Sequence, residues 1–350
     1  MKQIIIDHIK NLGPITTSQF INLALFHPKY GYYVSCNPFG AQGDFTTAPE
    51  ISQVFGELIA AYIINNFQNF NLKQASLVEM GAGRGVMMRD MLQIFEKSTS
   101  VKSKFDFNIV EISKKLQKIQ ENTLKNSNSV NFHDDFNNFQ QKNPKKPIFF
   151  VANELFDCFA IDQFIKTKQG FVQRLINFDA KKDQFCFVFD QFNQEISDKI
   201  AEITPNNTQV NSITEHSPYA ASLMAQICQS IKNVGQMAII IDYGYIKSPL
   251  KSTLQAIKNH QQSHIFEHIG TSDLTSLVDF NMLQNIAKKH HLNSSLITQR
   301  EFLTSLGIKI RQEQLIKGKN KQQQDQIKSA ISRLIDNSQM GELFKVLIVW

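Results

Sequence analysis

Cysteine is scarce in this sequence and is not arranged to bind a metal. The 350 residues include 4 cysteines, which lie far apart and in none of the Cys/Cys or Cys/His spacings of a zinc site. This pattern excludes a zinc ribbon or finger and predicts free thiols in a reducing, cytosol-like compartment. His264 and His268 have the i, i+4 spacing of a helix, but no third ligand accompanies them. We therefore expect no metal site.

Long apolar runs and a targeting segment are also lacking. No window approaches the ~18 uninterrupted apolar residues of a membrane-spanning helix, so no membrane span is expected. Residues 1–12 are too short and too charged for a signal peptide, and they contain no arginine, unlike a mitochondrial presequence. These absences predict a cytoplasmic protein.

Neither sign of charge dominates the sequence. The formal net charge of +6 comes from 37 basic and 31 acidic residues and forms no long basic tract. Nucleic-acid binding is therefore not implied by charge, and we do not expect it. Nothing in the sequence indicates an oligomeric state.

Short apolar runs alternate with helical patterns from residue 75 onward, which is typical of βαβ units. Two of the runs, 148–152 and 236–241, are wholly apolar, which indicates buried parallel strands. The fold class expected is α/β, with a doubly wound, Rossmann-like sheet. Further strands are expected at 75–80, 105–110, 130–132 and 344–349, and helices at 51–67, 86–97, 113–125 and 279–290.

The chain is expected to fall into three parts. Residues 1–70 predict an N-terminal helical cap with a glycine-rich lid loop, and 71–160 together with 233–350 predict the core. Residues 161–232 leave the βαβ rhythm and predict a smaller α+β insertion on the substrate side. Within it, antiparallel strands are expected at 163–167, 171–178 and 184–190, and a helix at 219–231. The polar stretch 317–326 is interpreted as a solvated helix end or a loop.

A glycine-rich turn between the strand at 75–80 and the following helix predicts a nucleotide-like ligand. Gly81, Gly83 and Gly85 alternate with other residues, and only glycine lets a ligand approach bare backbone there. The dinucleotide fingerprint G-x-G-x-x-G is not met, because Val86 occupies its third glycine position. Glu79 disfavours a phosphate and favours a cationic ligand. S-adenosylmethionine carries an ammonium and a sulfonium, and it is the cofactor that we predict.

Acidic residues follow the next two strands and extend this cofactor site. Glu111 ends the second strand, where a carboxylate can accept hydrogen bonds from both ribose hydroxyls. Asp134 and Asp135 follow the third strand, where one of them could accept from the adenine amino group. An ordinary surface acid or a helix cap is the alternative for both residues.

The fourth strand ends in a polar group that predicts the acceptor site. Asn153, Glu154 and Asp157 lie among phenylalanines, and carboxylates there could clamp a guanidinium through paired hydrogen bonds. These three residues are the catalytic candidates. In the alternative interpretation, Asn153 caps the next helix and the acids are solvated.

Two loops add further candidates. Gly43, Asp44 and Thr46 lie in the glycine-rich loop and could fold over the cofactor. Asp242 and Tyr243 end the strand at 236–241, where they could face the acceptor or only order the loop.

These strings together resemble the MidA-type methyltransferases, whose mitochondrial members help to assemble respiratory complex I. The resemblance spans nearly the whole chain in order. It rests on residues 27–28, 30–33, 43–45, 47–52, 55–57, 79–85, 152–154, 156–157, 163–164, 241–245, 274–275, 278–280, 340–341 and 343–346.

The resemblance implies a class I methyltransferase fold and methylation of protein arginine to symmetric dimethylarginine. The implied protein substrate is the large quinone-site subunit of complex I or a bacterial equivalent. A bacterial member would act in the cytoplasm, and a eukaryotic one in the mitochondrial matrix. The alternatives are a small-molecule or RNA methyltransferase and a non-catalytic assembly factor that binds the methyl donor.

Overall fold

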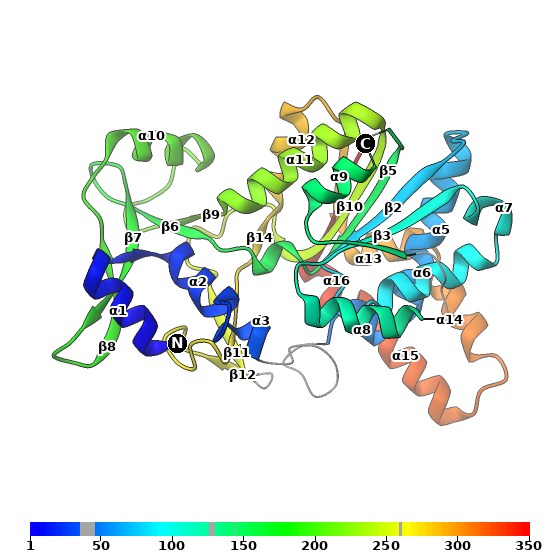
Figure 1. Ribbon diagram of the computed structural model, residues 1–350, viewed down its shortest axis with the longest axis horizontal. Coiled ribbons are helices and arrows are strands. Elements are labelled where there is room, and N and C mark those ends of the chain that lie inside the picture. The colour runs from blue at the N-terminus through cyan, green and yellow to red at the C-terminus, as the bar shows by residue number, and fades with distance from the viewer. Residues whose placement is uncertain (36–45, 126–129, 144, 259–260) are drawn as a thin grey trace. The chain divides into compact units, whose positions relative to one another are not determined.

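The computed structural model describes residues 1–35, 46–125, 130–143, 145–258 and 261–350 (Figure 1). Its contacts divide the chain into two compact units. The core unit comprises Thr46–Leu155, Met224–Gly244 and Leu283–Trp350. The small-sheet unit comprises Met1–Phe45, Phe156–Leu223 and Tyr245–Met282. Residues 46–70 therefore group with the core, whereas the expected insertion groups with the N-terminal helices.

A mixed sheet forms the centre of the core unit. Its strands lie in the order β15-β16-β10-β5-β2-β3-β4. Numbered along the chain and read from the β4 edge, this order is 3-2-1-4-5-7-6. All neighbours are parallel except β16, which runs antiparallel to both β10 and β15. The strands are β2 (Ala75–Met80), β3 (Phe105–Val110), β4 (Val130–His133), β5 (Ile148–Asn153), β10 (Gln236–Tyr245), β15 (Ser294–Thr298) and β16 (Phe344–Val349).

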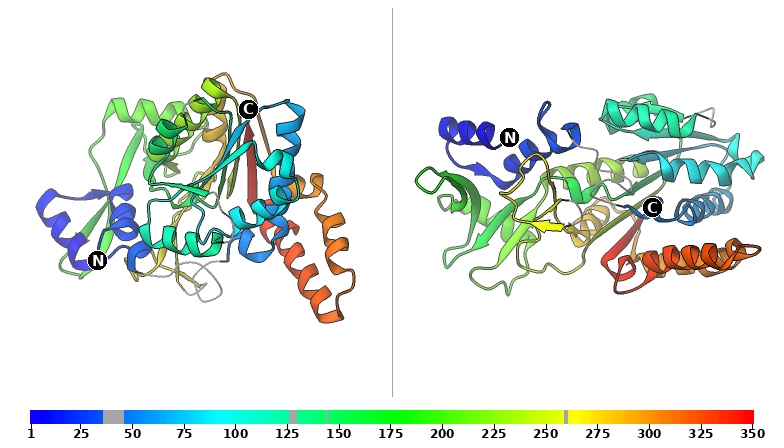
Figure 2. Two further views of the ribbon diagram at one scale, coloured as in Figure 1. Left: turned by 45° about the vertical axis from the view of Figure 1, so that its right-hand side comes forward. Right: turned by 90° about the horizontal axis from the view of Figure 1, so that it is seen from below.

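Helices cover both faces of this sheet (Figure 2). Side chains alternate between the faces along a strand. Phe149 of β5 accordingly packs near Phe105 on one face, whereas Phe150 meets Phe136 on the other. The helices are α4 (Ala48–Ile51), α5 (Val54–Asn69), α6 (Val86–Glu96), α7 (Thr99–Lys102), α8 (Lys114–Leu124), α9 (Phe136–Lys142), α13 (Gln299–Ser305), α14 (Ile308–Ile316), α15 (Lys321–Ile335) and α16 (Met340–Leu343). The expected doubly wound α/β fold is confirmed.

The direction of chain progression reverses between β2 and β5. From β2 the chain adds β3 and β4 on one side, and then β5 and β10 on the other. Ligands of open α/β sheets bind beside such a reversal, outside the carboxyl ends of the strands. The turn after β2 and the residues after β5 therefore occupy the position where a ligand is expected.

The small-sheet unit contains two antiparallel sheets. One has the order β1-β7-β6-β9 with β8 paired to β7, which confirms the antiparallel strands expected between 163 and 190. The strands of these two sheets are β1 (Ile15–Thr16), β6 (Asp162–Lys166), β7 (Phe171–Asp179), β8 (Gln184–Phe189), β9 (Ile213–His216), β11 (Gln255–Lys258), β12 (Gln261–Ser263) and β13 (Asp273–Thr275). The short strand β14 (Val278–Asp279) pairs instead with β10. The helices are α1 (Lys2–Leu12), α2 (Thr17–Phe26), α3 (Tyr32–Ser35), the 3-10 turn η1 (Phe156–Cys158) and α10 (Gln194–Ile203). Helices α11 (Pro218–Val234) and α12 (Phe280–Lys289) continue from this unit into the core unit.

One expected helix differs from the structure, and the polar stretch takes one of its two expected forms, a solvated helix end. The helix expected at 51–67 is two helices, α4 and α5, because Ser52 is extended with φ −158° and ψ 132°. The polar stretch 317–326 includes the first turns of α15, which Asn320 begins with a reciprocal capping box to Gln323. Among the described residues, none of the helices has the length and apolar character needed to cross a membrane.

Candidate active site at the carboxyl edge of the core sheet

The turn after β2 has a backbone that strongly favours glycine. Gly81, Gly83 and Gly85 all have left-handed backbones, with φ of 73°, 52° and 78°. A side chain at Gly81 would also place its Cβ 2.8 Å from the Cδ1 atom of Leu155. Gly85 begins α6. The turn therefore presents bare backbone and a helix N-terminus at the position where the strand order reverses.

Glu79 lies beneath this turn with its side chain almost wholly buried. Burial raises the pKa of the Glu79 carboxyl to about 8, with a smaller increase from Asp90, while a hydrogen bond from the Met88 amide lowers it. Among the described residues, the Glu79 Oε2 atom has no hydrogen-bond partner. A buried carboxyl oxygen without a partner is costly, and a cationic ligand would satisfy it.

Glu111 is held by two neighbours after β3. The Ser113 amide donates to Oε1 at 2.8 Å, and the Gln120 side chain donates to Oε2 at 3.2 Å. The same Gln120 amide donates to the carbonyl of Gly83 at 2.9 Å, so α8 connects the acid to the glycine turn. Sequence reasoning missed Gln120, because its partners lie far away in the sequence.

An exposed apolar side chain stands beside Glu111. Ile112 is 78% exposed, whereas Glu111 is buried. An isoleucine that leaves this much apolar surface in water at a ligand edge could be covered by the flat face of a base. Ile112 was not among the predicted site residues, and only its position directly after Glu111 could have indicated it.

The structure gives the two aspartates after β4 different surroundings. The Asp135 carboxylate accepts from the Asn138 amide at 2.7 Å and caps α9. Asp134 accepts from the Gln117 side chain at 3.0 Å and pairs with Lys114. Asp135 therefore has the structural role of capping α9, whereas, within the described residues, Asp134 binds only side chains and is the stronger candidate for an adenine contact.

Glu154 adopts a strained backbone directly after β5. Its φ is 51°, a left-handed value that residues other than glycine rarely adopt. Its Oε1 atom accepts from the Ala48 amide at 3.1 Å and from the Asn153 side chain at 3.2 Å. Asn153 is buried, and among the described residues its Oδ1 atom has no hydrogen-bond partner. A buried, unpartnered acceptor next to a strained acid indicates a site for a hydrogen-bond donor.

Asp157 and Asp242 have structural contacts of their own. Asp157 is buried in η1 of the small-sheet unit, and its charge is one of those that, after burial, raise the pKa of Tyr33. Asp242 is wholly buried in β10 and accepts from the amides of Leu155 at 3.1 Å and Tyr243 at 2.9 Å. Asp242 thereby orders the residue that follows Glu154.

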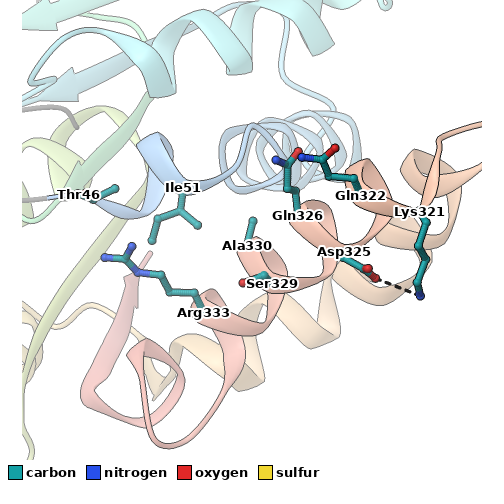
Figure 3. Close-up of a pocket in the computed structure, with 9 residues that line it drawn as sticks. All are labelled: Thr46, Ile51, Lys321, Gln322, Asp325, Gln326, Ser329, Ala330 and Arg333. Atoms are coloured by element: carbon teal, nitrogen blue, oxygen red, sulfur yellow. Dashed lines mark ion pairs between the residues drawn. The ribbon is translucent and has the colours of Figure 1, made fainter.

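The cofactor-lid candidates are only partly described. Gly43 and Asp44 lie outside the described residues, whereas Thr46 lines a groove of about 900 Å³ together with Ile51 and α15 (Figure 3). Glu50 of α4 forms a 3.5 Å ion pair with Arg84 in the glycine turn. Helix α4 is thus connected both to the glycine turn and to Glu154. In the described parts of the chain, no group of three or more His, Cys, Asp or Glu residues could hold a metal ion.

Comparison with known proteins places the chain in a family. Residues 58–298 match the family described as "Putative S-adenosyl-L-methionine-dependent methyltransferase". The mitochondrial protein arginine methyltransferase NDUFAF7 of Xenopus laevis is 31% identical over 99% of this chain and 83% of its own length. Human NDUFAF7 is 30% identical over 96% of this chain and 80% of its own length.

Solved structures share the fold. A Burkholderia thailandensis protein crystallised with S-adenosyl-homocysteine aligns with a TM-score of 0.86 at 23% identity, over 99% of this chain and 91% of that one. A second crystal structure from Burkholderia thailandensis, of an uncharacterized protein, gives a TM-score of 0.84 at 22% identity, over 99% and 90% of the two chains. The chain belongs to this family of S-adenosyl-L-methionine-dependent methyltransferases.

Proposed function

We propose that this protein transfers a methyl group from S-adenosylmethionine to an arginine side chain of another protein. The observation that carries the proposal is the strained backbone of Glu154, which lies with Asn153 at the carboxyl end of β5. The glycine turn follows the neighbouring strand β2, on the other side of the point where the strand order reverses. The relatives that match nearly the whole chain are named protein arginine methyltransferases, which supports an arginine acceptor.

The residues around the glycine turn fit the methyl donor. The turn's backbone and Glu79 would hold the amino-acid end, because the unpartnered Oε2 atom can pair with an ammonium. Glu111 would accept from the ribose hydroxyls, Ile112 would cover the base, and Asp134 would accept from its amino group. Gly43, Asp44 and Thr46 remain proposed lid residues, and Asp135 remains a weaker candidate. The donor supplies an electrophilic methyl group when it is bound.

Glu154 and Asn153 would orient the acceptor nitrogen. The Glu154 carboxylate and the Asn153 Oδ1 atom can each accept an N–H of a guanidinium, which fixes its plane and draws positive charge away from the attacking nitrogen. After transfer the nitrogen must lose one proton, and Glu154 would accept this proton as the general base. We propose Asp157 as the second clamping carboxylate, and Asp242 and Tyr243 as residues that order the acceptor side.

The acceptor protein that the family resemblance implies is the large quinone-site subunit of respiratory complex I or its bacterial equivalent, methylated to symmetric dimethylarginine. A bacterial protein would act in the cytoplasm. The relatives named above are mitochondrial proteins.

The test of this function is to identify the methylated product. The purified chain is incubated with methyl-labelled donor and a cell lysate, and the protein fraction is hydrolysed to amino acids. We expect the label in dimethylarginine. Label in RNA or in small molecules would refute the arginine assignment, and absence of any transfer by a chain that binds the donor would favour a non-catalytic assembly factor.

The raised pKa of Glu79 predicts that donor binding depends on pH. A carboxyl whose folded pKa is raised to about 8 keeps its proton at pH 6.5, and must lose it to pair with an ammonium. The affinity for S-adenosyl-homocysteine should therefore increase by up to about tenfold between pH 6.5 and 7.5 and level off above pH 8.

In the absence of ligand, the raised pKa of Glu79 should lower the free energy of unfolding as the pH rises from 4.5 to about 8, because the folded state holds this proton more tightly than the unfolded chain.

Calorimetry across this pH range measures the effect, with Glu79→Gln as the matched neutral variant. The variant should bind more weakly at pH 8 and show little pH dependence. An equal slope in the variant would show that Glu79 does not contact the ammonium.

A further inference from the structure

The positive charge of the chain is concentrated in one helical hairpin. Residues 308–335, which form α14, a short connection and α15, contain seven Lys or Arg and two Asp or Glu. This basic hairpin therefore carries five of the six excess positive charges of the whole sequence. The two helices lie side by side at the edge of the core unit (Figures 1 and 2). Such a local excess attracts acidic partners.

Most of this charge is not neutralised within the core unit. Arg311 is the exception, because it binds Glu57 of α5 through two hydrogen bonds of 2.7 and 3.0 Å. Lys321 pairs with Asp325 at 3.3 Å, an exposed contact that contributes little. Among the described residues, the Arg333 guanidinium makes no ion pair or hydrogen bond. Exposed cations also remain at Lys309, Lys317, Lys319 and Lys328.

Arg333 points into the groove between α15 and α4. Figure 3 shows its guanidinium directed toward Thr46 and Ile51, with Gln326 and Ala330 on the same side of the helix. The groove continues along α15 to Lys321 and Gln322. Its walls thus combine two cations, Lys321 and Arg333, with one carboxylate, Asp325, which is already paired with Lys321. The amide side chains of Gln322 and Gln326 can donate to and accept from a peptide backbone.

One end of the groove lies close along the chain to a residue that contacts the candidate acceptor site. Thr46, at its inner end, precedes Ala48 by two residues, and the Ala48 amide binds the Glu154 carboxylate at 3.1 Å. A chain segment lying in the groove would therefore be continuous with a residue presented to Glu154.

We propose that the basic hairpin and its groove bind an acidic, extended segment of the acceptor protein next to the methylated residue, with Arg333 and Lys321 pairing with its carboxylates. The proposal rests on the proposed function, because it assumes a protein acceptor. A nucleic acid is the less favoured partner, because residues 308–335 contain no aromatic side chain on which bases could stack.

The test uses the full chain and three fluorescent probes. The first is a peptide of about fifteen residues with one arginine and a run of glutamates, the second replaces the glutamates by lysines, and the third is an oligouridylate of similar length. The hairpin variant is Lys321→Glu/Arg333→Glu. The control variant is Lys181→Glu/Lys182→Glu, which makes the same change in net charge at two exposed residues between β7 and β8.

Anisotropy should show that the wild type prefers the acidic peptide. The hairpin variant should bind this peptide about tenfold or more weakly, and the control within twofold, at equal ionic strength. Equal losses in both variants, or no binding by the wild type, would overturn the proposal, as would tighter binding of the oligouridylate. Calorimetry with S-adenosyl-homocysteine is run on each protein. A wild type that binds the acidic peptide but not this ligand would refute the proposed function and leave the docking surface standing.

Discussion

Replacing Gly81 by valine should abolish binding of the methyl donor. The residue has φ 73°, which a β-branched side chain adopts only with strain, and a Cβ there would lie 2.8 Å from Leu155. The added side chain would also cover the backbone that the ligand must approach. We expect the affinity for S-adenosyl-homocysteine to fall at least about a hundredfold, roughly 2.7 kcal/mol, in titration calorimetry.

Gly235→Val is the matched control for this loss. Gly235 has nearly the same backbone, φ 78°, but an added Cβ would meet no atom within 4 Å. The control should lose some stability from the same backbone strain and keep its affinity for the ligand. If both variants are folded and bind equally well, the glycine turn is not the donor site.

Glu154→Gln should leave donor binding intact and reduce methyl transfer by about a thousandfold. Glutamine has the same shape, and its side-chain oxygen can still accept from the Ala48 amide that holds Glu154. The variant loses the negative charge that would attract the guanidinium, and it loses the base that would accept the guanidinium proton. Initial rates of label transfer measure the loss, and calorimetry checks that the affinity for S-adenosyl-homocysteine stays within twofold.

Asp183→Asn is the control for the effect of neutralising an acidic residue that has a left-handed backbone. Asp183 has a left-handed φ of 48°, close to the 51° of Glu154, but it lies in an exposed turn of the small-sheet unit. Its neutralisation should not change the rate. Full activity of Glu154→Gln would remove Glu154 from the mechanism.

Most of the core could be predicted from the sequence, because its strands are continuous apolar runs with polar ends. The strands at 75–80, 105–110 and 344–349 begin and end where they were expected. β15 (Ser294–Thr298) was missed because it pairs only with β16, is half-buried, and carries serine and threonine that resemble a loop. The start of α15 was missed although Asn320 and Gln323 form a capping box that the sequence contains.

The candidate site was predictable where it depends on local order and not where it depends on distant contacts. A strand followed by alternating glycines places Gly81 at a strand end in any βαβ unit. No local pattern indicates that Gln120 reaches Gly83 across 37 positions, or that a glutamate adopts a left-handed backbone. The contacts of Glu154 with Ala48 depend on the folded core, which brings α4 to the end of β5.

The interior position of β16 has a consequence for the order of folding during synthesis. This strand is inserted between β10 and β15, although every other strand of the sheet precedes it in the chain. When a nascent chain has emerged from the ribosome only as far as α16, the edge of β10 that later pairs with β16 is still unpaired. Such an open strand invites wrong pairing with other chains. We expect the growing polypeptide to need chaperone protection until residues 344–349 become available.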